Sequence, residues 1–297
     1  MSLNLLREKV APLNLATSAL AALGAAIDGR MTGRHFDPQI QPHVDAVLDA
    51  LGVRQLIADL DTAELAPVFA EIRLTMLHGS KLLQANGREA GWTFADHGIL
   101  QAAGDTSVGF ATVLQQKIVP ALPGLAERLD RSGAFLDIGA GVAAFSIAMA
   151  RLWPTLRVVG VEPWPPSIAL ARENLRTADC GDRIELREQR GEEIRDASAF
   201  DLAWVPSVFI SAVSLEAIVR CVNRALRPGG WVIFAMINPG KDPLAGALAR
   251  LRTMLWGGTL LGAEEAQGML EKAGYRDVQR LPTPPSVPVV LIAGRRE

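Results

Sequence analysis

The sequence has few cysteines and no excess of basic residues, and each shortage excludes a class of protein. Cys180 and Cys221 are its 2 cysteines, too few for a disulfide framework and without the spacing of metal ligands. The net charge of -2 disfavours tight electrostatic binding to nucleic acid. We therefore expect a protein with no bound metal and no nucleic-acid partner.

Long hydrophobic runs are also missing. No segment has about 18 uninterrupted apolar residues, and the alanine-rich residues 11–27 lack the basic front and the cleavage signature of a secretory signal. These features predict a cytoplasmic protein that does not bind a membrane. The length of 297 residues predicts two domains, or one domain with a large extension.

The most informative segment is an apolar run that ends in glycines. Residues 135–138 predict a short buried strand, and Gly139 and Gly141 lack the β-carbons that would keep a ligand away from the turn. The helix predicted over residues 142–151 would direct its free backbone N–H groups at a ligand above these glycines. This arrangement predicts a site for a nucleotide-like cofactor.

An acid in this segment distinguishes between two classes of cofactor. Gly139, Gly141 and Ala144 satisfy the loose GxGxx[GA] pattern of dinucleotide-binding folds, but the carboxylate of Asp137 would repel a pyrophosphate. S-adenosylmethionine carries an ammonium and a sulfonium group and no phosphate. Asp137 therefore favours the methyl donor over a dinucleotide.

Further strands follow in a recognisable order. Residues 157–162 read as a second strand that ends in Glu162, whose carboxylate can accept both ribose hydroxyls of either cofactor. Residues 201–206 and 227–234 predict two more strands, with a helix over residues 215–226 between them. The segments LDIGAG, VVGVEP, FDLAWVP and LRPGGWVIF, in this order, resemble the class I S-adenosylmethionine-dependent methyltransferases.

The resemblance covers about residues 125–297 and implies an α/β fold. The expected architecture is a Rossmann-like class I methyltransferase core, with a mostly parallel seven-stranded sheet and helices on both faces. The helical residues 263–275 and the strand-like residues 277–280 and 287–293 look like the last helix and the closing hairpin of that family.

The residues before this core predict helices. Apolar residues recur at helical intervals in three stretches, residues 44–51, 65–83 and 109–118. The prolines and glycine of residues 120–124 indicate a boundary there. We therefore expect an all-α N-terminal domain over residues 1–122, acting as a lid, in substrate binding or in dimerisation, and a donor-binding methyltransferase domain over residues 123–297.

The resemblance also implies a donor site for S-adenosylmethionine, with S-adenosylhomocysteine as the product. The expected donor-binding residues are Asp137, Gly139 and Gly141 for the methionine part, Glu162 for the ribose, Pro163 and Trp164 over the adenine, and Ala140, Gln189, Arg190, Gly191 and Trp204 elsewhere around the donor. Family members often place an acid after the third strand to bind the adenine amino group. Here Gln189 or Arg190 stands there, so the adenine contact stays open. Trp164 could equally be a surface aromatic residue that precedes a proline-led helix.

Aromatic residues predict the site of the methyl acceptor. The expected acceptor-binding residues are Trp92, Val205, Pro206, Phe209 and Trp256. The stretch from Trp204 to Phe209 lacks the polar first residue and the second proline of the family's nucleobase amino-methyltransferases, which argues against that chemistry. Core packing explains Trp204 and Phe209 equally well, and Trp256 could simply end a helix before two glycines.

A histidine is the expected general base. All 4 histidines, His35, His43, His78 and His97, precede the predicted core. We favour His97 because it lies in a polar and aromatic segment near the predicted boundary, although a surface or capping histidine would look the same.

We therefore expect methyl transfer from S-adenosylmethionine to a small, hydrophobic molecule, with O-methylation preferred. The alternatives are an N- or C-methyltransferase acting on a small molecule, an NAD-dependent oxidoreductase, and a protein of the same fold that binds the donor without methylating anything. Besides the acceptor, a second copy of the chain is the partner that we expect.

Overall fold

The computed structural model describes residues 2–84, 90–238, 241–283 and 289–297. By its internal contacts the chain divides into two compact units, Met1–Asn86 and Gly87–Glu297, and we describe each by itself. This division lies well before the boundary that we predicted between residues 122 and 123. The helix α5 (His97–Val113), which precedes the predicted boundary, belongs to the second unit.

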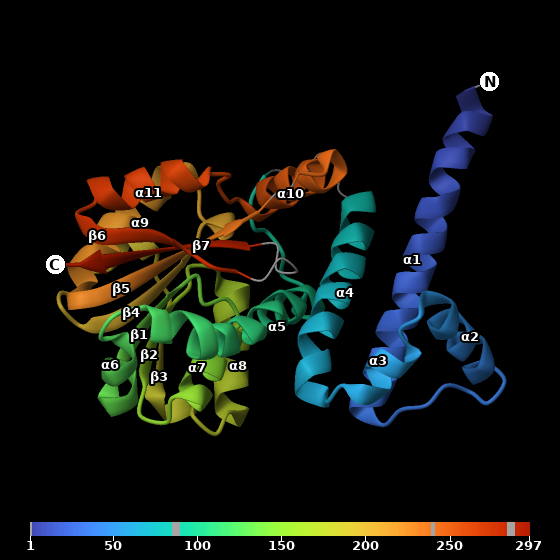
Figure 1. The fold of residues 1–297 in the computed structure, drawn as a ribbon, viewed down its shortest axis with the longest axis horizontal. Coiled ribbons are helices and arrows are strands. Elements are labelled where there is room, and N and C mark those ends of the chain that lie inside the picture. The colour runs from blue at the N-terminus through green and yellow to red at the C-terminus, as the bar shows by residue number, and fades with distance from the viewer. Residues whose placement is uncertain (1, 85–89, 239–240, 284–288) are drawn as a thin grey trace. The chain divides into compact units, whose positions relative to one another are not determined.

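In the described residues of the first unit, all regular secondary structure is helical, as the apolar spacing predicted. Its helices are α1 (Ser2–Thr32), α2 (Gln41–Leu51), α3 (Arg54–Asp59) and α4 (Thr62–Leu83) (Figure 1). A capping box between Asp61 and Glu64 starts α4. Their shared core consists of the buried residues Ile27, Val44, Leu48, Ile57, Leu65 and Ile72.

The helix α1 has the length and composition of a membrane span. Within its most apolar window, 11% of the residues are buried in the structure. Signal sequences and core helices of soluble proteins also have this length and composition. The predicted cytoplasmic location therefore stays a prediction.

The second unit contains a seven-stranded sheet with the order β3-β2-β1-β4-β5-β7-β6. The strands are β1 (Ala134–Ile138), β2 (Arg157–Val161), β3 (Ile184–Arg187), β4 (Phe200–Pro206), β5 (Leu226–Ile237), β6 (Tyr275–Leu281) and β7 (Val289–Arg296). β7 pairs antiparallel with β5 and with β6, and the other pairs are parallel. The mostly parallel sheet and the closing hairpin confirm the predicted fold class.

Helices cover both faces of this sheet (Figure 1). α6 (Leu125–Ser132), α7 (Ala144–Leu152) and α8 (Pro165–Thr177) lie on one face, and α9 (Ala212–Ala225) and α11 (Ala263–Lys272) lie on the other. Side chains alternate along a strand. Leu202 and Trp204 of β4 therefore pack in the core under α6, α7 and α8, and Ala203 and Val205 pack in the core under α9 and α11. Both faces of the sheet are thus covered, and the ends of its strands are left for a ligand site.

The helix α5 packs directly against the start of α7. A β-carbon at Gly104 would lie 2.3 Å from Cγ2 of Val142, so the absence of a side chain at residue 104 permits this close approach. Asn174 on α8 adds a polar link, because its Nδ2 donates to Oε1 of Gln101 at 3.1 Å and to the carbonyl of Val142 at 2.9 Å. A π-helical turn (Leu114–Ile118) and a 3-10 turn (Val119–Ala121) then lead towards α6.

Candidate active site

The loop after β1 turns through three residues with left-handed backbone conformations. The φ angle is 69° at Gly139, 56° at Gly141 and 63° at Ala143, a region that glycine adopts without strain. The helix α7 therefore begins at Ala144, two residues after the start that we predicted at Val142. This turn places backbone N–H groups at the carboxyl end of the sheet, where open α/β folds bind ligands.

The carboxylate of Glu162 links this loop to the end of β2. Its Oε2 accepts a hydrogen bond from the backbone N–H of Gly141 at 2.9 Å, and its Oε1 accepts one from the N–H of Trp164 at 2.7 Å. Glu162 is 7% exposed. Burial raises the pKa of this carboxyl, and the two backbone donors oppose that shift. Each oxygen retains acceptor capacity for a ligand hydroxyl, as the predicted ribose contact requires.

Asp137 is a second buried acid beside the same loop. It is 2% exposed, and the hydroxyl of Ser146 donates to its Oδ2 at 2.6 Å. Burial raises its pKa to about 7; the Ser146 hydrogen bond lowers the value, and the charge of Glu162 raises it further. Two buried acids that repel one another favour a cationic ligand and disfavour a pyrophosphate. Nothing in the sequence indicated Ser146, which lies next to Asp137 only in the folded chain.

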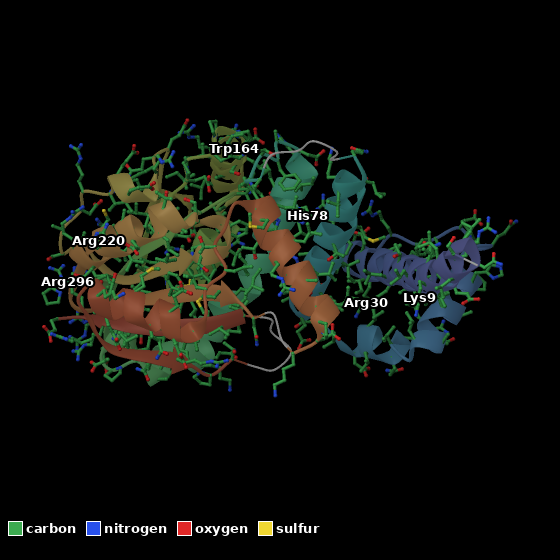
Figure 2. All side chains as sticks on the ribbon, turned by 90° about the horizontal axis from the view of Figure 1, so that it is seen from above. Lys9, Arg30, His78, Trp164, Arg220 and Arg296 are labelled. Atoms are coloured by element: carbon green, nitrogen blue, oxygen red, sulfur yellow. The ribbon has the colours of Figure 1, made fainter. Side chains whose placement is uncertain are left out.

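Trp164 uses its side chain to contact a distant segment. Its indole Nε1 donates to the backbone carbonyl of Phe94 at 2.7 Å. Its ring is half-buried and Pro163 is exposed. Figure 2 shows Trp164 far from Arg296, which lies at the amino edge of the sheet. The sequence carried no signal for Phe94, which acts through its backbone.

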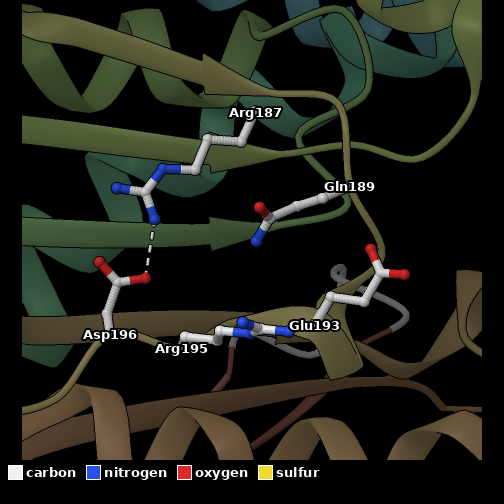
Figure 3. A pocket seen from close by; sticks show the side chains of 5 residues that line it. All are labelled: Arg187, Gln189, Glu193, Arg195 and Asp196. Carbon is white, nitrogen blue, oxygen red and sulfur yellow. Dashed lines mark hydrogen bonds and ion pairs between the residues drawn. The ribbon is translucent and has the colours of Figure 1, made fainter.

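The residues expected near the adenine lie in different environments. Gln189 lines an open cavity of about 490 Å³ together with Arg187, Glu193, Arg195 and Asp196 (Figure 3). Arg190 forms an ion pair with Glu192 at 3.3 Å. Gly191 is buried against α9, where a β-carbon would lie 2.9 Å from Ile218. Gly191 is thus explained by packing, and the donor contacts of Gln189 and Arg190 stay predictions.

The end of β4 contains residues that face opposite ways. Trp204 packs with Phe110 at 5.9 Å and with Phe145 at 5.1 Å between ring centroids. Val205 is fully buried in the core under α9, so the structure does not place it where an acceptor could reach it. Pro206, in contrast, has its Cγ 3.9 Å from the β-carbon position of Gly139, next to the loop after β1.

Three predicted acceptor residues come together in one cluster, which we call the aromatic wall. Trp92 lies edge-on to Phe209 at 5.4 Å and to Trp256 at 6.3 Å, and the rings of Phe209 and Trp256 stack at 4.9 Å. Phe209 ends the turn Ser207–Phe209 directly after β4, and Trp256 ends the helix α10 (Pro243–Trp256). Phe209 is 39% exposed, so the wall presents an aromatic face.

Backbone contacts fix the three segments that carry the aromatic wall. The N–H of Gly91 donates to the carbonyl of Met254 at 3.3 Å. A β-carbon at Gly258 would lie 1.9 Å from the carbonyl oxygen of Val208, so the chain after α10 approaches the turn after β4 as closely as glycine permits. The relative places of the three rings are therefore set by the main chain.

His97 is exposed at the first position of α5. The side chain of Asp96 accepts a hydrogen bond from the N–H of Ile99 at 3.1 Å and so caps the helix. Asp96 is thus engaged as a cap, and a role of His97 as general base stays a prediction. In the described parts of the chain, no three His, Cys, Asp or Glu side chains are grouped as metal ligands.

Residues 136–234 match the family model described as a methyltransferase domain. This part of the chain is thus similar to methyltransferase domains. The match begins in β1 and ends in β5, so it includes the loop after β1, Glu162 and the end of β4. S-adenosylmethionine, the cofactor that we predicted, is the donor of this family.

The chain is also similar to curated proteins that are named as methyltransferases. A ubiquinone biosynthesis O-methyltransferase of Methylobacterium nodulans is 30% identical over 152 residues, which are 51% of this chain and 54% of the relative. The chain thus spans about half the length of the curated relatives that it matches.

Solved structures share the fold over nearly the whole chain. An O-methyltransferase family protein from Burkholderia thailandensis is 14% identical with a TM-score of 0.66, over 100% of this chain and 98% of that chain. Human N-acetylserotonin methyltransferase is 15% identical with a TM-score of 0.59, over 100% of this chain and 98% of that chain. At these identities the likeness concerns the fold alone.

Proposed function

We propose that the protein transfers the methyl group of S-adenosylmethionine to a hydroxyl group of a small, hydrophobic molecule. One observation carries the proposal: the buried Glu162 carboxylate joins the loop after β1 to the end of β2, within the methyltransferase domain. The relative from Methylobacterium nodulans is an O-methyltransferase, which supports oxygen as the accepting atom.

The charges of the site support this donor over NAD. The donor supplies a methyl group that is already activated by its positive sulfur. Asp137 and Glu162 together offer the negative charge that a cation needs and that a pyrophosphate would oppose. In this proposal Glu162 accepts the ribose hydroxyls, Asp137 balances the positive charge of the donor, and the N–H groups of the loop orient the methionine part.

The aromatic wall supports a hydrophobic acceptor. Its exposed ring, that of Phe209, directly follows the strand β4, whose end lies next to Gly139. Methyl transfer needs chiefly an acceptor atom held close to the methyl group and in line with the leaving sulfur, an effect that can reach roughly 7 to 11 kcal/mol. The wall would position the acceptor, and His97 is the residue that we propose to take its proton.

Calorimetric titration of the protein with S-adenosylhomocysteine and, separately, with NAD tests the donor. We expect micromolar binding of the former and none of the latter, and the reverse result would move the protein to redox chemistry. A screen with labelled donor then compares phenols, carboxylic acids and amines as acceptors. Labelled amines or carbon atoms would indicate N- or C-methylation, and tight donor binding without any labelled product would indicate a protein that does not methylate.

The helical first unit would act as a lid or in dimerisation in the cytoplasm. The first half of α1 exposes Leu3, Leu6 and Leu13, and a second copy of the chain would cover them. Light scattering measures the mass of the particle in solution, and sedimentation with lipid vesicles tests the alternative, that a membrane covers this helix. A monomer that sediments with vesicles would contradict both the dimer and the expected location.

A further inference from the structure

The donor site and the aromatic wall are connected through one tryptophan. The backbone N–H of Trp164 donates to Oε1 of Glu162 at 2.7 Å, and its indole Nε1 donates to the carbonyl of Phe94 at 2.7 Å. Trp92 lies two positions before Phe94, and the two rings are in edge contact at 5.0 Å. A single residue thus joins the expected ribose ligand to the segment that carries one ring of the wall.

The segment with Trp92 and Phe94 is held on its other side by the loop after β1. It leads into α5, which the close approach of Gly104 to Val142 holds against this loop. Asn174 donates to Gln101 on α5 and to the carbonyl of Val142. The loop after β1 and the residues after β2 would bind the donor. The same two places therefore also position the segment with Trp92 and Phe94.

We propose that Trp164 is a positioning residue for the acceptor side. Its indole N–H holds the carbonyl of Phe94, so that a donor bound at Glu162 stabilises Trp92 in its place against Phe209 and Trp256. The proposal rests on the proposed function, because it takes the donor to bind at Glu162. It differs from the adenine contact that the sequence suggested for Trp164, since the side chain acts here through its N–H group on the protein's own backbone.

Trp164→Phe tests the proposal, because phenylalanine keeps an aromatic ring and lacks the N–H donor. Trp231→Phe is the matched control: its indole Nε1 donates to the carbonyl of Pro123 at 3.3 Å, at the amino edge of the sheet. Trp164→Tyr, which also lacks the indole N–H, is a second variant in case the first does not fold. The readout is amide hydrogen exchange of the full-length protein, with and without saturating S-adenosylhomocysteine, together with the affinity for this ligand.

In the wild type and in Trp231→Phe, we expect the ligand to slow exchange in residues 91–99 by about three- to tenfold, the scale of one ordinary hydrogen bond. In Trp164→Phe this slowing should disappear, while the affinity for S-adenosylhomocysteine stays within about twofold of the wild-type value, a difference smaller than one hydrogen bond would produce.

Three results would overturn the proposal. The first is slowing of the same size in Trp164→Phe. The second is a wild type that binds the ligand without slowing exchange in residues 91–99. The third is a loss of affinity of about tenfold or more in Trp164→Phe, the scale of a lost direct contact, which would return the ring to the donor site. A wild type that does not bind S-adenosylhomocysteine would instead refute the proposed function, and the inference with it.

Discussion

Replacing Asp137 by asparagine should change how the stability of the second unit depends on pH. Burial raises the pKa of Asp137 from its usual 3.8 to about 7, against the hydrogen bond from Ser146 and with the help of the Glu162 charge. Between these values the folded state keeps a proton that the unfolded state has released, so stability falls as the pH rises and levels off above about pH 7. A shift of about three units corresponds to about 4 kcal/mol over the whole range.

Asparagine is neutral at every pH, and its amide oxygen can still accept the hydrogen bond from Ser146. Asp137→Asn should therefore gain about 2 to 2.5 kcal/mol relative to the wild type between pH 5 and pH 7. Urea unfolding at each pH, followed by tryptophan fluorescence, measures this difference. The signal reports on the second unit, since all 6 tryptophans lie within it.

The exposed Asp130 on α6 provides the control. Asp130→Asn should follow the wild-type dependence on pH, because its side chain remains in water in both states. If Asp137→Asn and the wild type differ by a constant amount from pH 5 to pH 7, the Asp137 carboxyl titrates in its usual range. Burial and the neighbouring acid would then have no net effect on the pKa of Asp137.

Three further substitutions test the site and its support. Glu162→Ala should weaken the binding of S-adenosylhomocysteine by about 1 to 3 kcal/mol in calorimetry, because ligand hydroxyls lose a buried acceptor; unchanged affinity would refute the ribose placement. Gly258→Ala should lower the free energy of unfolding by about 1 to 3 kcal/mol, since its β-carbon would lie 1.9 Å from the Val208 carbonyl, whereas Gly268→Ala, inside α11, has no neighbour within 4 Å and should not. His97→Ala should lower kcat by roughly 10²-fold with unchanged donor affinity if His97 takes the acceptor proton, and an unaffected rate would remove this role.

The glycine-rich loop and the strands around it could be predicted because their signals are local. An apolar run before Gly139 and Gly141, and an acid at the end of the next strand, imply a ligand site whatever the rest of the chain does. The orientation of Trp204 and Val205 could not be predicted in this way. A strand buried on both faces shows no alternation of polar and apolar residues, so its sequence does not reveal which side chain faces the site.

Contacts between distant segments explain the other differences. Ser146 joins Asp137 only because α7 folds back over β1, and the sequence gives no sign of that hydrogen bond. The predicted boundary near residue 122 followed the prolines and the glycine there. The division by internal contacts instead places α5 in the second unit, where Gly104 lies close to Val142.

The place of α5 decides how pieces of this protein could be exchanged with those of its relatives. A chimera that joins a foreign helical region at residue 123 would remove Gly104 and Gln101, and with them the support that Val142 receives from α5. A join close to residue 87 keeps this support and brings the aromatic residues Trp92 and Phe94 along with the sheet. Recombination at that point would vary the helical unit and leave the loop after β1, Glu162 and the aromatic wall together in one segment of the chain.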